Sequence, residues 1–158
     1  MKHPVPEVGP IDDLIEATLQ RAGARAAASA PEKPRASTDP ALDERLTAQL
    51  KKGVAALLDK KADKLVVLNL QGLTTMSDYF VLATAGSDRQ AQALADAVEM
   101  ALKAEGRRPL SIEGYQSAAW ILLDYGDVVF HVFHHEARRF YGLERLWGDA
   151  PDATAAFR

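Results

Sequence analysis

Three histidines, His131, His134 and His135, stand close together in the last third of the chain, and Glu136 follows them. Imidazole and carboxylate groups are common ligands of zinc and similar metals. A metal site needs its ligands to converge, and the neighbouring His134 and His135 cannot share one helix face. His131 is expected on a strand and so points elsewhere. The pattern therefore favours a polar strand end and a helix start, with no metal.

Two aspartates, Asp124 and Asp127, flank the dipeptide Tyr125-Gly126. Paired carboxylates can perform acid–base chemistry. Aspartates are also favoured at turns because they bind nearby backbone amides, and no third polar group follows that would complete a site. We expect a tight turn here rather than a catalytic pair.

Gly86-Ser87 precedes a helical pattern and could hold an anion at the helix N-terminus. It faintly resembles the opening of a nucleotidyltransferase site. Such a site needs two close acids on an adjoining strand to hold a divalent metal. The nearest acid, Asp96, falls in the middle of the predicted helix without an acidic partner. We expect Ser87 to cap the helix, with Gln90 completing a capping box.

The composition and the missing motifs exclude several further kinds of catalytic and metal site. The chain has no cysteine, which excludes disulfides, thiolate metal sites and a cysteine nucleophile. No Walker motif, dinucleotide fingerprint or nucleophile elbow is present. The arginines are scattered and are expected to be mainly solvated, so direct contact with nucleic acid should be small. The residues indicate no cofactor and no enzyme.

The 158 residues carry a net charge of −3, and no apolar run is long enough to cross a membrane. The first residues lack the apolar region of a secretory signal and include several acids, so a cytoplasmic protein is expected. Residues 1–40 hold six of the 8 prolines and no aromatic residue. They are expected to be a flexible extension, with a short amphipathic helix within residues 10–28. A domain over 41–150 and a tail over 151–158 complete the chain.

Apolar periodicity places the elements that position these groups. A helix is expected from Pro40, with Asp39 as its cap, to about Lys60. A second helix begins after Ser87 and ends at Gly106, and a last one spans about 135–147. Strands are expected at residues 64–70, 78–84, 109–112, 119–124 and 127–133, the third at a sheet edge because of Pro109. The order α-β-β-α-β-β-β-α predicts an α/β domain with a mixed sheet and flanking helices.

The last two strands form a hairpin, and its faces differ. With Tyr125-Gly126 as the loop, Asp124 pairs with Asp127, Leu122 with Val129 and Trp120 with His131, and directly paired residues share a face. The opposite face is entirely apolar and belongs against helices: Ala119, Ile121, Leu123, Val128, Phe130 and Val132.

The face that carries Trp120 is an apolar patch rimmed by Asp124, Asp127 and His131. It fits two interpretations equally well on physical grounds. It could be a docking surface for another protein, with tryptophan as the main contact. It could equally be core, covered by the chain's own helices. A dimer formed through the same face is a third arrangement.

The chain also resembles the Iojap-like ribosomal silencing factors, the RsfS family. The resemblance covers about residues 41–150. It rests on the runs SDYFVLATAGSDRQ from Ser77, EG from Glu113, WILLDYGDVVFHVF from Trp120 and RFYGLERLWGDA from Arg139. The first forty residues fall outside it.

The resemblance implies a fold similar to nucleotidyltransferases without their activity. It implies a protein that binds the large ribosomal subunit through its protein number fourteen, blocks subunit joining and represses translation, with a role in large-subunit maturation in some members. It places the docking surface on the hairpin: Trp120, Leu122, Asp124 and Tyr125. The face count adds Asp127, Val129 and His131 to that set. Trp120 is expected to be the anchor, and the aspartates are expected to meet basic groups of the partner.

Overall fold

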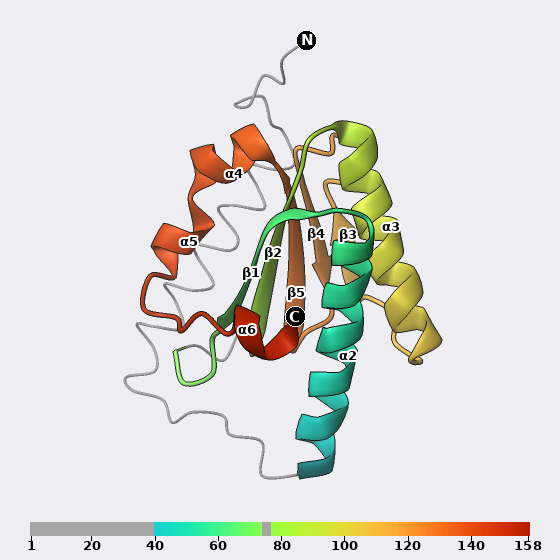
Figure 1. Cartoon of the computed structure of the whole chain (residues 1–158), viewed down its shortest axis with the longest axis vertical. Coiled ribbons are helices and arrows are strands. Elements are labelled where there is room, and N and C mark those ends of the chain that lie inside the picture. The colour runs from blue at the N-terminus through green and yellow to red at the C-terminus, as the bar shows by residue number, and fades with distance from the viewer. Residues whose placement is uncertain (1–39, 74–76) are drawn as a thin grey trace.

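A computed structural model describes residues 40–73 and 77–158 of this chain. A five-stranded mixed sheet lies between two layers of helices (Figure 1). Helices α2 (Pro40–Asp59) and α3 (Asp88–Ala104) cover one side of it, and α4 (His135–Tyr141) and α5 (Leu143–Leu146) lie on the other. The α/β class expected from the sequence is confirmed. The predicted cap Asp39 and the helix within 10–28 lie outside the described residues.

The sheet has the order β1-β2-β5-β4-β3. Its strands are β1 (Asp63–Asn69), β2 (Tyr79–Ala85), β3 (Ser111–Glu113), β4 (Trp120–Asp124) and β5 (Val128–His134). Only β2 and β5 run parallel; the other neighbours are antiparallel. β3 forms one edge, as was predicted from Pro109, although the strand begins only at Ser111. The outer edge of β1 is covered by the chain near its C-terminus, where the amide of Asn69 donates to the carbonyl of Pro151.

The ends of α3 follow the sequence signals closely. The Ser87 hydroxyl accepts a hydrogen bond from the amide of Gln90 at 3.0 Å, and the Gln90 side chain returns to the amide of Gly86 at 2.7 Å. At the other end Gly106 has φ +84°, and the amide of Arg107 donates to the carbonyl of Leu102. This is the left-handed glycine ending that stops a helix without a steric penalty.

Two apolar clusters form, one on each side of the sheet. The cluster under α2 and α3 includes Leu50, Val54, Val81, Leu94, Ile121, Leu123 and Phe130. The cluster on the other side, which we call the Trp120 face, includes Leu68, Phe80, Leu82, Trp120, Leu122, Val129, Phe133, Ala137 and Leu143. The predicted division of the hairpin into two faces is confirmed, except that Ala119 packs in the second cluster.

The hairpin register differs from the prediction by two residues. Trp120 pairs with Phe133, Leu122 with His131 and Asp124 with Val129. The amide of Tyr125 donates to the carbonyl of Val128, so the loop is Gly126-Asp127 rather than Tyr125-Gly126. Gly126 has φ +90°, which a glycine at the first loop position accepts at no cost. A shift of two residues leaves the side chains of β4 and β5 on their predicted faces, because strands alternate with a period of two.

Two further expectations need correction. The helix predicted over about 135–147 is broken at Gly142, which adopts φ +56° and separates α4 from α5. The last residues, expected to be a tail, pack on the domain through helix α6 (Thr154–Phe157). Phe157 is buried, and its ring lies edge-on to that of Tyr79 at 5.4 Å. No sequence pattern predicts α6, since four residues are too few to show a helical periodicity.

Candidate binding face

Trp120 lies inside the protein and is only 1% exposed. Its indole stacks on Phe133 at 5.0 Å and lies 5.3 Å from the ring of Tyr141, the last residue of α4. On the sequence alone this face could be either bare or covered, and the family resemblance favoured a bare face. The structure shows it covered. Trp120 is therefore not an exposed anchor in this state of the chain.

His131 is as deeply buried as Trp120. Its Nδ1 accepts a hydrogen bond of 3.1 Å from Trp120 Nε1. No described group pairs with its Nε2. Burial lowers the pKa of His131 to about 3, because the charged imidazolium would be desolvated among aromatic rings. The imidazole is therefore neutral near pH 7 and contributes no charge to a partner.

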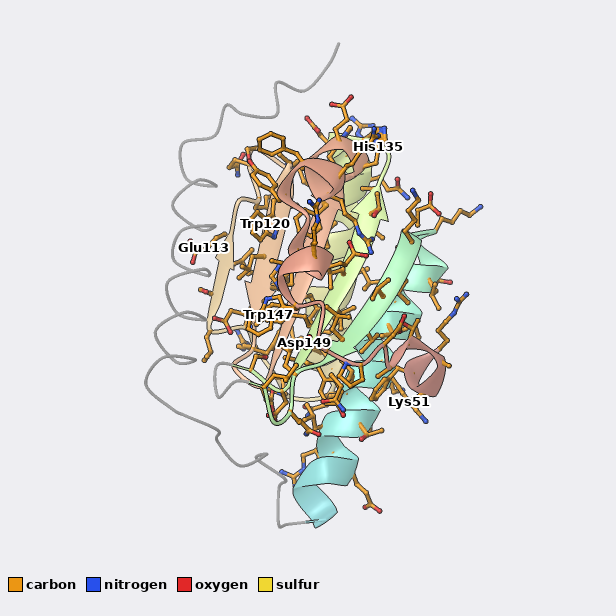
Figure 2. The ribbon with its side chains drawn as sticks, turned by 90° about the vertical axis from the view of Figure 1, so that its left-hand side faces the viewer. Lys51, Glu113, Trp120, His135, Trp147 and Asp149 are labelled. Atoms are coloured by element: carbon orange, nitrogen blue, oxygen red, sulfur yellow. The ribbon has the colours of Figure 1, made fainter. Side chains whose placement is uncertain are left out.

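The other side chains of this face become more exposed toward β3, at the edge of the sheet. Leu122 and Val129 are each 7% exposed. Asp124 is half-buried, and its carboxylate accepts from the amide of Gly126 at 2.8 Å. Glu113, which pairs with Leu122 across β3 and β4, is exposed. Figure 2 shows Glu113 beside Trp120 at the margin of the sheet, with Trp147 and Asp149 on the same side. An acidic margin thus borders the buried face.

Tyr125 and Asp127, also predicted to belong to this face, lie elsewhere. Tyr125 is buried in the cluster under α2 and α3, edge-on to Phe130 at 5.8 Å. Burial raises its pKa to about 12. Asp127 sits in the hairpin loop and forms an ion pair of 3.0 Å with Arg107. Arg107 also donates to the carbonyl of Tyr125 and to the side chain of Gln49, so it fixes the loop to α2.

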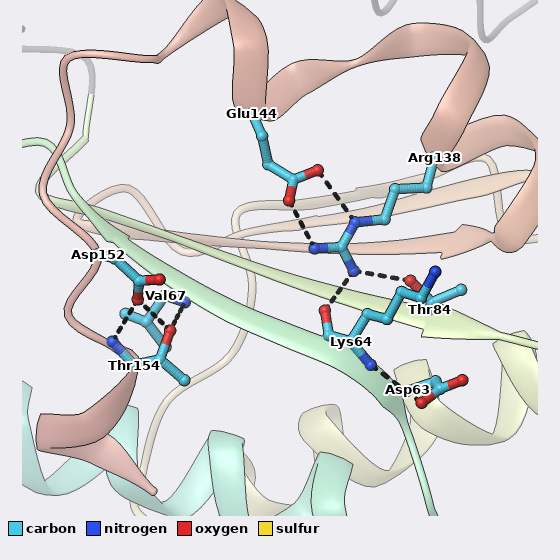
Figure 3. A network of polar contacts seen from close by, with 8 residues as sticks. All are labelled: Asp63, Lys64, Val67, Thr84, Arg138, Glu144, Asp152 and Thr154. Carbon is cyan, nitrogen blue, oxygen red and sulfur yellow. Dashed lines mark hydrogen bonds and ion pairs between the residues drawn. The ribbon is translucent and has the colours of Figure 1, made fainter.

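Arg138 anchors the helices that cover the Trp120 face (Figure 3). Its guanidinium donates to the Thr84 hydroxyl at 2.7 Å, to the carbonyl of Lys64, and to both carboxylate oxygens of Glu144 at 3.2 and 3.0 Å. This joins α4 and α5 to each other and to β1 and β2. The scattered arginines of the sequence predict that Arg138 is solvated, and the structure contradicts this. Arg138 is buried. Its contact with Thr84 on β2 could not be predicted from the residues that neighbour it in the sequence.

The other candidate chemical groups serve local structure. Ser87 caps α3, and Asp96 accepts a hydrogen bond of 3.0 Å from the hydroxyl of Tyr115. His134 caps α4 through the amide of Glu136, whereas His135 is exposed. Within residues 40–73 and 77–158, no three acidic or histidine side chains gather as metal ligands. In the same ranges, no helix is long and apolar enough to span a membrane.

Fold and site together define a mixed-sheet α/β protein whose distinctive feature is an aromatic sheet face with an acidic margin. Comparison with known protein families identifies one family for this chain. The model described as "Ribosomal silencing factor during starvation" matches residues 43–157. The chain belongs to this family.

Relatives and solved structures agree with that assignment. The ribosomal silencing factor RsfS of Bacillus subtilis is 42% identical over 108 residues, covering 68% of this chain and 92% of the relative. An Iojap-related mitochondrial protein of Arabidopsis thaliana is 33% identical over 62% of this chain and 55% of its own length. A crystal structure from Chromobacterium violaceum has a TM-score of 0.63 at 38% identity, covering 64% of this chain and 84% of that one.

Proposed function

We propose that this protein is a translation repressor that binds the large ribosomal subunit at its protein number fourteen and so blocks joining of the small subunit. Family membership over residues 43–157 is the observation that carries this proposal. Curated relatives named ribosomal silencing factors match most of their own length. Such a protein acts where ribosomes are, in the cytoplasm.

The mechanism needs occupancy of a surface and no chemical step. A specific complex requires about 800 Å² buried on each partner. If the joined ribosome and the complex use the same surface of the large subunit, each excludes the other. Repression then follows the concentration of the protein relative to its dissociation constant. Asp96 and Ser87, the two groups nearest to a nucleotidyltransferase-like arrangement, are exposed and serve local structure, as the acceptor for the Tyr115 hydroxyl and as the cap of α3.

We place the proposed docking surface on the hairpin, and we divide its residues into accessible acids at the margin and a buried layer beneath them. Asp124 and Glu113 are the accessible acids at its margin and would meet cations of a ribosomal protein. Trp120, Leu122, Val129 and His131 form the layer beneath and come into contact only if their cover moves. Tyr125 and Asp127 would act indirectly, by holding the loop that ends β4.

Gradient sedimentation with purified ribosomal subunits tests this function. The protein should migrate with free large subunits and be absent from joined ribosomes. Asp124→Asn keeps the acceptor for the Gly126 amide but removes the charge, and Glu113→Lys reverses the charge of an exposed residue. Each should weaken binding several-fold, with a reduced dependence on salt.

Glu105→Lys provides the matched control, because Glu105 is exposed at the end of α3, where a cation is well tolerated. It should bind as the unchanged protein does. Absence of the protein from the large-subunit fractions would refute the proposed function. Binding that is equal for all three variants would retain the function but remove the acidic margin from the interface.

A further inference from the structure

Helix α4 packs on the sheet through one face and leaves the other face in solvent. Its inner face holds Ala137 and Arg138, which are both buried. Its outer face holds Arg139 and Phe140, which are both exposed, and Phe140 is 60% exposed. Among the aromatic residues in the described part of the chain, Phe140 is the only exposed one. The outer face of α4 therefore places an aromatic ring in solvent beside a cation.

Neighbouring groups hold the exposed ring of Phe140 in place. It lies edge-on to Tyr141, with the ring centroids 4.9 Å apart and the ring planes at 84°. The Tyr141 ring in turn lies 5.3 Å from that of Trp120, and Arg138 ties the helix to Thr84 on the sheet. In an edge-on pair at least one face of the Phe140 ring stays free of Tyr141. A flat ligand would therefore meet a ring that has little conformational freedom left to lose.

A second arginine lies at the other end of α4. Arg145 reaches back from α5, and its Nη2 lies 2.9 Å from the position that a Cβ atom of Gly142 would occupy. Gly142 directly follows the last residue of α4. Within residues 40–73 and 77–158, the ion pairs involve other arginines, and neither Arg139 nor Arg145 takes part in one. Both guanidinium groups therefore keep their hydrogen-bond donors available for a ligand.

The acidic residues of α4 and α5 do not cancel this charge. Glu144 binds Arg138 through both carboxylate oxygens. Glu136 is half-buried in the first turn of α4, where the helix amides stabilise a carboxylate. One remaining acid thus stands against two unpaired arginines, Arg139 and Arg145. The exposed surface of the two helices carries an excess of positive charge.

We propose that Phe140, Arg139 and Arg145, which we call the Phe140 surface, bind single-stranded RNA. The ring of Phe140 would stack on an unpaired base, and the two guanidinium groups would contact phosphates that flank it. Aromatic rings stack on bases of any sequence, and arginine is well suited to phosphate. An acidic peptide would satisfy the arginines but would leave the ring without a flat partner. The assignment of this RNA to the large ribosomal subunit rests on the proposed function.

The position of the Phe140 surface suits the proposed docking. Helices α4 and α5 lie on the same side of the sheet as the acidic margin at Glu113 and Asp124 (Figure 1). A particle made of RNA and basic proteins presents both phosphates and cations on its surface. The acidic margin would meet its protein, and the Phe140 surface would meet its RNA. A contact with one base and its flanking phosphates is small, in keeping with the limited nucleic-acid contact expected from the sequence.

Titration of the ¹⁵N-labelled full chain with a uridine oligonucleotide of about twelve residues tests the site without the ribosome. The shifts of amide signals should concentrate in residues 135–145. Phe140→Leu keeps an exposed apolar side chain but removes the flat ring, and it should weaken binding about tenfold. Phe140→Tyr keeps the ring and should bind as the unchanged protein does. Absence of shifts in this region, or equal affinity of the leucine variant, would overturn the proposal.

Arg139→Gln and Arg145→Gln test the phosphate contacts. Each should reduce the slope of log affinity against log salt concentration by about 0.7, the share of one phosphate in a single strand. Lys103→Gln removes an exposed cation at the end of α3, on the opposite side of the sheet, and should change neither affinity nor slope. Equal losses in all three variants would overturn the site, because they would indicate general attraction. A polyglutamate peptide that binds as tightly through the same residues would overturn RNA in favour of an acidic protein partner.

Purified large subunits separate this inference from the proposed function. If their RNA is the ligand, Phe140→Leu should weaken binding to large subunits by a similar factor, and Phe140→Tyr should leave it unchanged. Unchanged affinity of the leucine variant for large subunits would refute contact with their RNA. Failure of the unchanged protein to bind large subunits would instead refute the proposed function, whereas the oligonucleotide titration decides the Phe140 surface by itself.

Discussion

Trp120 and His131 lie diagonally opposite on neighbouring strands β4 and β5, and the indole Nε1 donates to the imidazole Nδ1 at 3.1 Å. The bond fixes His131 in the tautomer protonated on Nε2, because Nδ1 must be free to accept. It also gives the indole N–H a partner without solvent, which a buried tryptophan requires. The pair therefore makes the aromatic sheet face compatible with burial, while Nε2 of His131 has no partner among the residues that the structure describes.

The buried histidine predicts a defined dependence of stability on pH. Its pKa is about 3 in the folded chain and 6.5 ordinarily, so between these values the unfolded chain binds a proton that the folded chain does not. Stability should therefore fall as the pH is lowered through this window, by up to about 1.4 kcal/mol per pH unit. Urea unfolding from pH 7 to pH 4 measures the effect.

His131→Gln is the control for that experiment, since glutamine keeps an acceptor for the indole but does not titrate. The stability of the unchanged protein relative to this variant should decrease as the pH falls. Parallel stability curves for the two proteins would show that His131 does not carry the dependence.

Truncation of the indole should be costly to the domain. Trp120→Phe removes the donor to His131 and leaves space beside Phe133 and Tyr141, so we expect a loss of about 2–3 kcal/mol in the free energy of unfolding. A double-mutant cycle with His131→Phe isolates the hydrogen bond, which should couple the two sites by about 1 kcal/mol. Additive effects of the two substitutions would mean that the bond contributes nothing measurable.

Gly53, inside α2, should resist replacement by alanine despite alanine's better helix propensity. A Cβ atom there would lie 2.5 Å from Cζ and 2.7 Å from Cε2 of Phe130. Overpacking of this kind costs about 1–3 kcal/mol, which exceeds the propensity gain of about 1 kcal/mol. Gly53→Ala should thus lower the thermal midpoint. In a Phe130→Leu background the same change should become neutral or stabilising, and a persistent loss there would disprove the steric explanation.

The ion pair between Arg138 and Glu144 should govern how firmly α4 and α5 cover the sheet. Glu144→Gln weakens a bidentate contact to a buried guanidinium and should cost about 2 kcal/mol. Hydrogen exchange of the α4 amides should accelerate correspondingly. Arg139→Gln, at the exposed neighbouring position, is the control and should change neither quantity. Equal effects of the two substitutions would mean that the contact with Glu144 does not hold the helices.

Local signals explain why most elements could be predicted. The Ser87 and Gln90 cap, the Gly106 ending and the edge position of β3 depend on residues close in sequence, and all three predictions are confirmed. The break at Gly142 was missed because a single glycine is also tolerated inside a helix. The hairpin loop was misplaced by one residue, although glycine followed by aspartate is itself a loop signal for the observed turn.

The candidate site was harder to predict, because burial depends on what packs over a face. Alternation along β4 and β5 correctly grouped Trp120, Leu122, Asp124, Val129 and His131 on one side. It could not show that Tyr141 closes over the indole or that Arg138 anchors the covering helices. Tyr125, which the resemblance and not the alternation assigned to the site, packs in the cluster under α2 and α3.

A subunit-joining assay tests the central claim most directly. Light scattering of purified subunits rises when they join, and protein incubated first with large subunits should suppress that rise in proportion to the fraction of large subunits bound. The same protein added to ribosomes that have already joined should have little immediate effect. Full joining in the presence of large subunits saturated with the protein would contradict the account, because bound protein would then leave the joining surface free.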